Sequence, residues 1–277
     1  MDNELLNLRK KIFLTGYSAS IAHLASAFSI VEILYVLYLK HILRYNPKNP
    51  KQEDRDLFIL SKGHGSLALY VTLCEAGFFD EQILRGFSKP GSYLGGEPCI
   101  PNIPGVEAST GSLGHGLSIG TGMALAKKLD KKDNKVYVLL GDGECEEGTV
   151  WEAAMFASHY NLNNLVAIID NNKLQKMDTL EKVMGINSWK NLFVSLNWEI
   201  REVDGHNVEQ LEKVLAEPNN SEKPLLIIAN TVKGKGVSIV ENNPKWHWKL
   251  PNKKELKIFM QELNISEEEI ELCKEHI

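Results

Sequence analysis

Short apolar runs alternate with longer amphipathic stretches along most of this chain. The runs are rich in Val, Ile and Leu, which predicts strands of a parallel sheet covered on both faces. These runs occupy residues 57–60, 136–140, 165–169, 198–203 and 224–231. Stretches with a three-to-four-residue apolar repeat predict helices at 5–15, 30–43, 113–129 and 149–160. The alternation predicts the α/β class, with a mostly parallel central sheet and helices on both of its faces.

Two other stretches complete this prediction. One face of the helix predicted over 149–160 consists of Trp151, Ala154, Met155 and Ser158. By contrast, the Gly- and Pro-rich stretch from Phe87 to Thr110 has little periodicity and is longer than an ordinary connection. Irregular loops of this length are commonly functional, so we expect this one to contribute to a site.

The composition limits the range of functions without identifying one. A net charge of −5 and a pI near 5.9, with Lys and Arg scattered, argue against a nucleic-acid partner. The amino terminus lacks the positive region of a signal peptide, and the apolar stretch 30–39 is interrupted by Glu32 and too short to span a bilayer. We therefore expect a soluble, cytoplasmic protein, not a membrane protein, with residues 1–277 forming a single domain.

Cysteine spacing argues against two kinds of stabilising site. Cys74, Cys99, Cys145 and Cys273 are dispersed with no Cys-x-x-Cys pair, which indicates neither a zinc site nor a disulfide framework. Cys145 lies just after a Gly-Asp-Gly motif. We interpret it as a small residue beside the sheet edge and not as a nucleophile.

The strongest chemical signal lies where two of the predicted strands end. The run 136–140 leads into Gly141-Asp-Gly143, and the run 165–169 leads into Asp170-Asn-Asn172. Both strand ends open on one edge of a parallel sheet, so Asp142, the Asn172 amide oxygen and a backbone carbonyl can converge on one hard cation. Mg²⁺ prefers such oxygen ligands and shares them with phosphate. Either motif alone is typical of a turn, but together at this spacing they predict a thiamine diphosphate site.

Further motifs carry a resemblance that covers almost the whole chain. They are Ser61-Lys-Gly-His-Gly-Ser66, Thr110-Gly-Ser-Leu-Gly-His-Gly116, Asp204-Gly-His206, Thr231-Val-Lys-Gly-Lys-Gly236 and Trp246-His247. In this order, and with the Gly-Asp-Gly motif between the second and the third, they resemble the amino-terminal, diphosphate-binding half of a transketolase. The resemblance is to the kind of transketolase that is encoded as two separate chains.

The resemblance implies roles at the diphosphate end of the cofactor. It assigns Asp142, Asn172 and the carbonyl of Leu174 to Mg²⁺, and it brings Gly143 and Asn172 against the diphosphate of thiamine diphosphate. A glycine in this motif would let the backbone approach the diphosphate closely.

It also implies roles near the reacting atoms. His64 and His247 match positions close to the diphosphate and the reacting carbons, and His23 matches a histidine that faces the acceptor. Imidazole suits proton transfer, since its unperturbed pKa is about 6.5. The backbone that hydrogen-bonds the aminopyrimidine would be that of Gly111, Ser112 and Leu113.

Three departures from the family pattern fall on the substrate side. The residues around His23 are bulkier and more apolar than the family's glycine and proline. Glu97 stands where many transketolases have a donor-contacting histidine, and Trp248 stands where a glycine commonly follows the closing histidine. Trp248 could stack on a sugar or nucleobase, or could pack against a partner chain. These changes are the basis for the hypothesis that the substrate is a modified or nucleotide-linked sugar.

One essential group lies outside these residues. In the family, a glutamate on the pyrimidine-binding half triggers carbanion formation on the cofactor, and that half is not part of this sequence. Glu144 and Glu146 follow the diphosphate motif and cannot replace it, while Glu147 matches a subunit-interface residue. The resemblance therefore implies an obligate partner chain that supplies this glutamate, in a heterotetramer with two copies of each chain.

The predicted activity is transfer of a two-carbon ketol unit to an aldehyde or keto sugar. An alternative is the α chain of a thiamine-dependent 2-oxo acid decarboxylase or dehydrogenase, which shares the Gly-Asp-Gly to Asn-Asn motif but is disfavoured by the segments 61–66 and 246–247. Another alternative is a non-catalytic regulatory chain. The intact Asp142, Asn172 and His64 argue against it.

Overall fold

A computed structural model describes residues 3–21, 23–186 and 188–274. Its central sheet has the strand order β1-β2-β3-β5-β4, and every neighbouring pair in it is parallel. The strands are β1 (Leu57–Leu60), β2 (Val136–Gly141), β3 (Leu165–Asn171), β4 (Glu199–Asp204) and β5 (Leu225–Asn230). All coincide within two residues with the predicted apolar runs, and the α/β prediction is confirmed.

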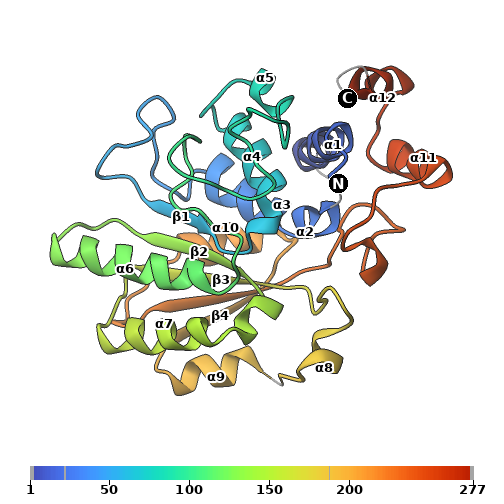
Figure 1. The fold of residues 1–277 in the computed structure, drawn as a ribbon. Helices are drawn as coiled ribbons and strands as arrows, with labels where there is room; N and C mark the ends of the chain where they lie inside the picture. The colour runs from blue at the N-terminus through green and yellow to red at the C-terminus, as the bar shows by residue number, and fades with distance from the viewer. Residues whose placement is uncertain (1–2, 22, 187, 275–277) are drawn as a thin grey trace.

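Helices cover both faces of the sheet (Figure 1). One layer contains α6 (His115–Leu129), α7 (Gly148–His159) and α9 (Trp189–Ser195). The other contains α1 (Asn3–Ser18), α2 (Leu24–Phe28), α3 (Val31–Leu34), α4 (Ser66–Glu75), α10 (Val208–Ala216) and α11 (Lys253–Glu262). Along β2, Val138 and Leu140 enter the first core and Tyr137 and Leu139 the second, because successive strand residues point to opposite faces.

The remaining elements are short, except for the last helix, which packs against α1. They are the π-helix η1 (Tyr35–Leu39), α5 (Glu81–Leu84), α8 (Leu180–Val183), α12 (Glu267–Lys274) and the 3₁₀ helices η2 (Gly63–Gly65), η3 (Gly143–Glu146) and η4 (Pro244–Trp246). No helix or strand lies in the stretch from Phe87 to Thr110, as predicted.

Two predicted helices have different ends in the structure. The helix predicted over 30–43 ends at Leu39 as a π-turn, and His41 follows with a left-handed φ of 56°. The helix predicted from residue 113 begins at His115, because Gly114 has a φ of 85° that a helix cannot contain.

Helix α4 was not predicted from the pattern of apolar positions. Its residues from Ser66 to Leu73 are all buried, so the segment shows no amphipathic repeat. The face prediction for α7 was only partly right. Its buried residues are Val150, Ala153, Ala154 and Ala157. Met155 instead is 53% exposed.

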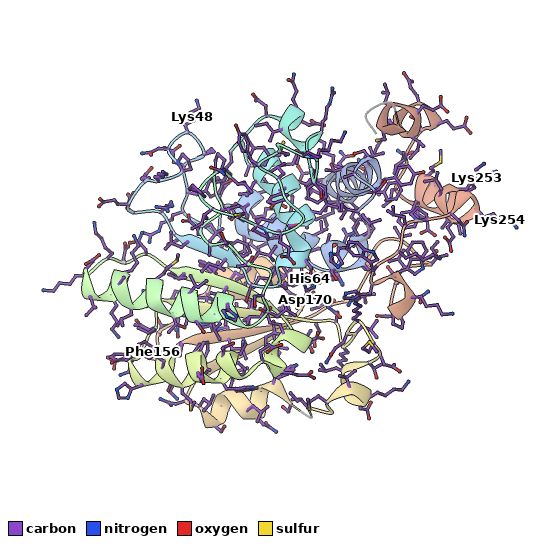
Figure 2. All side chains as sticks on the ribbon, in the orientation of Figure 1. Lys48, His64, Phe156, Asp170, Lys253 and Lys254 are labelled. Atoms are coloured by element: carbon purple, nitrogen blue, oxygen red, sulfur yellow. The ribbon has the colours of Figure 1, made fainter. Side chains whose placement is uncertain are left out.

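Apolar side chains gather on the outer surface of the α6–α7 layer. Leu129 ends α6 and is exposed, and Phe156 and Tyr160 at the end of α7 have ring centroids 4.5 Å apart. Figure 2 labels Phe156 on this layer, away from the central region that contains His64 and Asp170. Within the part of the chain that the structure describes, no helix combines the length and apolarity needed to cross a membrane.

Candidate functional site

The two motifs that end β2 and β3 meet at the carboxyl edge of the sheet. The register pairs Gly141 with Asp170, so the residues that follow each strand end lie together. The buried carboxylate of Asp142 accepts hydrogen bonds from the backbone N–H groups of Gly143 (2.7 Å) and Lys173. It is therefore held between the two motifs.

Asn172 and Leu174 complete this cluster. The buried Asn172 amide donates from Nδ2 to Asp170 (3.0 Å), and its Oδ1 accepts the backbone N–H of Leu174 (3.1 Å). The Leu174 carbonyl accepts a hydrogen bond from Nζ of Lys233 at 2.8 Å. The three predicted metal ligands are thus close neighbours, and all offer oxygen atoms.

The charge balance around Asp142 fits a divalent cation. Burial, together with the neighbouring carboxylate of Asp170, raises the pKa of Asp142 to about 6. Among the described residues, no ion pair neutralises Asp142. The described residues also contain no group of three or more His, Cys, Asp or Glu side chains that could hold a metal ion. A cation at this site would therefore depend on the Asp142 carboxylate with amide and carbonyl oxygens, a donor set that Mg²⁺ accepts.

A buried ion pair beneath this cluster was missed by the sequence analysis. Lys62 donates to Asp170 at 2.6 Å, and the two side chains are 1% and 0% exposed. Asp170 also accepts the hydroxyl groups of Ser29 (2.7 Å) and Thr231. Burial alone would raise the pKa of Asp170, but Lys62 and the hydroxyl donors outweigh it and hold the pKa below its usual value. Lys62 and Asp170 each lie at a strand end, but the sequence does not indicate that their side chains meet.

The histidine-glycine loop and the predicted pyrimidine loop are in backbone contact. A Cβ on Gly63 would lie 2.8 Å from the backbone nitrogen of Gly111, and the Thr110 hydroxyl donates to the Leu60 carbonyl at 2.7 Å. Of the three residues predicted to meet the aminopyrimidine, Gly111 and Leu113 are half-buried and Ser112 is exposed. This loop is therefore held against the sheet while part of it stays accessible.

The structure brings the three predicted catalytic histidines together. The ring centroids of His23 lie 5.6 Å from those of His64 and of His247, and His64 lies 6.2 Å from His247. Burial, reinforced by nearby lysines, lowers the pKa of His23 and of His247 to about 4. The pKa of His64 is lowered well below 6.5 for the same reasons, burial first. All three are neutral near pH 7.

A second lysine joins this cluster, and sequence analysis did not single it out. Nζ of Lys233 lies 3.2 Å from Nδ1 of His247 and bonds the Leu174 carbonyl. Burial, followed by repulsion from Lys62, lowers the pKa of Lys233 to about 8. Lys233 thus connects the histidines to the predicted metal ligands.

The Asp-Gly-His turn after β4 holds the segment that contains Lys233. His206 hydrogen-bonds Glu32 through Nδ1 (2.9 Å), and its Nε2 accepts the backbone N–H of Val232 (2.7 Å). Glu32 also receives two bonds from the buried Arg9 guanidinium, at 2.7 and 2.8 Å. The turn is therefore part of a buried network next to the site.

Two of the departures noted above lie close to the site. The Trp248 ring is edge-on to His23, with 4.3 Å between centroids, and is 56% exposed. The exposed carboxylate of Glu97 covers Gly111, where an added Cβ would lie 2.0 Å from its Oε2. The Ser66 hydroxyl fixes the adjacent Gly96 carbonyl at 2.6 Å. Both residues therefore border loops with predicted cofactor roles.

The glycine motif itself is more constrained at one glycine than at the other. A Cβ on Gly143 would lie 2.9 Å from the Gln175 side chain, whereas a Cβ on Gly141 would meet only ordinary contacts from 3.8 Å. A side chain at 143 would therefore have to displace the Gln175 side chain.

Burial raises the pKa of the Cys145 thiol well above its usual value, which keeps the thiolate nucleophile scarce.

A parallel α/β sheet with a buried carboxylate, an amide and clustered histidines at its carboxyl edge is typical of enzymes that bind a phosphorylated cofactor there. The chain belongs to the transketolase family, since residues 16–276 match that family's thiamine diphosphate binding domain. The match confirms the resemblance stated above and favours it over a 2-oxo acid decarboxylase chain.

Similar proteins include both separate subunits and longer transketolases. The chain is 41% identical over 264 residues to an apulose-4-phosphate transketolase subunit of Phocaeicola vulgatus, covering 95% of this chain and 93% of that one. It is 36% identical over 228 residues to the 6-deoxy-6-sulfo-D-fructose transketolase subunit SqwG of a Clostridium species, covering 82% of each. The crystal structure of Campylobacter jejuni transketolase superposes with a TM-score of 0.88 at 28% identity, over 99% of this chain but 45% of that one. The chain thus spans less than half of this longer transketolase.

Proposed function

We propose that this chain is the diphosphate-binding subunit of a two-chain transketolase that transfers a two-carbon ketol unit between sugars. The observation that carries the proposal is the convergence of Asp142, Asn172 and three neutral histidines at one sheet edge. It is found in a chain 41% identical, along nearly its whole length, to a protein named as one subunit of a transketolase. Residues 1–277 act as a single cofactor-binding domain in this proposal.

Binding of the cofactor is assigned to residues at that edge. Asp142, Asn172 and the Leu174 carbonyl hold Mg²⁺, and Gly143 and Asn172 contact the diphosphate. The loop Gly111-Ser-Leu113 meets the aminopyrimidine. When bound, thiamine diphosphate would supply the carbanion chemistry of its thiazolium ring, which ketol transfer needs. The protein supplies orientation and proton transfer around that chemistry.

The three histidines are assigned to the reacting sugar atoms. Because His23 and His247 have pKa values near 4, their rings are neutral at pH 7, so one nitrogen of each ring can donate a hydrogen bond and the other can accept one. The lysines Lys62 and Lys233 provide positive charge beside them. This arrangement suits the binding of anionic groups and the movement of protons on sugar hydroxyls.

A partner chain supplies the pyrimidine-binding half and the activating glutamate. Several relatives are named as single subunits of a transketolase, which supports a second chain, and the exposed apolar side chains of the α6–α7 layer offer a surface to bury. We propose a heterotetramer with two copies of each chain, located in the cytoplasm.

The substrate is proposed to be a modified sugar. Two relatives are named for such sugars, apulose 4-phosphate and 6-deoxy-6-sulfo-D-fructose. The Glu97 and Trp248 side chains differ from the common family residues and border the site, which supports an altered substrate side.

Reconstitution with the partner chain tests the proposal. The purified chain alone, the partner alone and the mixture would be assayed with Mg²⁺ and thiamine diphosphate against ketose phosphates, deoxy- and sulfo-sugars and nucleotide-linked keto sugars. We expect two-carbon transfer only by the mixture. Turnover by the chain alone would contradict the two-chain assignment, and no transfer by a cofactor-loaded mixture on any donor would contradict the transketolase activity.

A further inference from the structure

Glu144 is a buried carboxylate to which the proposed mechanism gives no role. It lies in η3, directly after the Gly-Asp-Gly motif, and is 2% exposed. Its Oε1 accepts the Ser61 hydroxyl and the backbone N–H of Gly114 (2.9 Å), and its Oε2 accepts the backbone N–H of Gly141 (3.0 Å). One side chain therefore satisfies three donors.

The three donors come from three separate segments of the site. Ser61 begins the histidine-glycine loop, Gly114 directly follows the predicted pyrimidine loop Gly111-Ser-Leu113, and Gly141 begins the diphosphate motif. Ser61 and Gly114 lie 83 and 30 residues from Glu144 in the sequence, so local structure alone does not hold these segments together.

Contacts between the same segments show how closely they fit. A Cβ on Gly116 would lie 2.3 Å from the Ser61 hydroxyl oxygen, and a Cβ on Gly63 would lie 2.8 Å from the backbone nitrogen of Gly111. The segments meet without space for another side chain, so a carboxylate that bonds all three determines their relative positions.

We propose that Glu144 is a positioning residue that fixes the histidine-glycine loop, the pyrimidine loop and the diphosphate motif in their binding arrangement before the cofactor arrives. The role of Glu144 in thiamine diphosphate binding rests on the proposed function, whereas its role in holding the three segments together does not. A carboxylate is required because both oxygens accept. In glutamine one of them becomes an NH₂ donor, which must face either the Gly141 N–H or the other two donors.

Hydrogen–deuterium exchange of the full, cofactor-free chain is the direct test. In Glu144→Gln we expect the amides of Gly114 and Gly141 to exchange at least about 10-fold faster, because each loses or weakens its acceptor. The segment 57–66 should exchange faster as well. The matched control is Glu146→Gln, two residues away, where the carboxylate is half-buried and bonds only the Gln175 amide in the described part of the chain.

Cofactor affinity is the second readout. With the partner chain present and Mg²⁺ saturating, titration of thiamine diphosphate by tryptophan fluorescence should give a Kd about 10- to 100-fold higher for Glu144→Gln than for Glu146→Gln, as for loss of a partner that orients a ligand. The Mg²⁺ concentration that supports half-maximal binding should change little, since Asp142 and Asn172 are intact.

Each outcome has a defined meaning. Faster exchange confined to one segment, or a Kd equal to that of Glu146→Gln, would overturn the proposal. So would a fall in Tm that accounts for all of the faster exchange. If Glu144→Gln fails to fold, Ser61→Ala is used instead. It removes the hydroxyl donor to Glu144 and must still speed hydrogen–deuterium exchange at the Gly114 amide. A parent complex that binds no thiamine diphosphate would contradict the proposed function and leave the exchange test standing.

Discussion

At the proposed diphosphate end of the site, the carboxylates are buried and each accepts several hydrogen bonds, whereas at the proposed substrate-facing end the side chains are exposed and sparsely bonded. Asp142 is held by two backbone N–H groups and Asp170 by a lysine, two hydroxyls and an amide. Glu97 and Trp248 lie on irregular segments and are exposed.

This difference indicates which part of the site can vary. Replacing a buried, bonded carboxylate leaves donors unsatisfied and costs stability, so the cofactor end tolerates few residues. An exposed side chain on a loop can change with little effect on folding. The relatives of this chain accordingly belong to one family yet are named for different sugars.

The largest expected effect is at the cofactor end. Asp142→Ala removes the charged member of a cluster otherwise made of an amide and a carbonyl. We expect loss of Mg²⁺-dependent thiamine diphosphate binding beyond the roughly 10- to 100-fold that loss of an outer-shell partner costs. Isothermal titration of the reconstituted complex measures it, with the exposed Asp130→Ala as control. Retained affinity would remove Asp142 from the metal site.

The parts of the site that the apolar pattern could predict share one property, whereas the histidines were predicted through the family resemblance. Asp142 and Asn172 follow apolar runs at strand ends, so chain order alone brings them to one edge. The Lys62–Asp170 pair was missed because the partners are 108 residues apart and only the packed sheet aligns them. Helix α4 was missed because it is buried on nearly all sides, so its sequence has no amphipathic repeat that would indicate a helix. The apolar pattern of the sequence thus predicts which residues lie at the carboxyl edge of the sheet, but not which of their side chains contact one another.

The buried pair at the cofactor end gives the second prediction. Asp170→Ala leaves the ammonium of Lys62 without its carboxylate in the interior, which should lower the free energy of unfolding by about 3–5 kcal/mol. Chemical denaturation measures the change. Its control is Asp178→Ala, which breaks the exposed Asp178–Lys182 pair and should leave stability nearly unchanged. An equal effect from both variants would show that burial of the Lys62–Asp170 pair does not determine how much it contributes to the free energy of unfolding.

The third prediction concerns His23, which lies between the two ends. Its folded pKa is about 4, below the ordinary 6.5, so the unfolded chain binds a proton first as the pH falls. The free energy of unfolding should therefore decrease as the pH falls from about 6.5 to 4, and the loss due to His23 should be complete below that window.

Denaturation at several pH values between 4 and 6.5 checks this contribution. His23→Gln should have a shallower dependence of stability on pH than the parent, because one of the histidines held neutral by folding is gone. The exposed His159→Gln is a control for loss of a histidine from the surface. An unchanged slope in His23→Gln would show that the environment of His23 does not disfavour its charged form.

The smallest expected effect on folding, and the sharpest test of the substrate-facing end, comes from Glu97. Its exposed carboxylate covers Gly111 of the predicted pyrimidine loop, where it can accept hydrogen bonds from sugar hydroxyls and would repel a nearby phosphate.

Glu97→His should leave Tm and cofactor affinity close to the parent values. It should also improve kcat/KM for simple ketose phosphates relative to modified sugars. Full kinetics on both substrate classes measure this ratio, with the exposed Glu212→Gln on α10 as control. Because the carboxylate is open to solvent, screening limits its effect, and we expect a change of roughly 10-fold or less. An unchanged ratio would remove Glu97 from substrate selection and leave Trp248, edge-on to His23, as the remaining departure at this end.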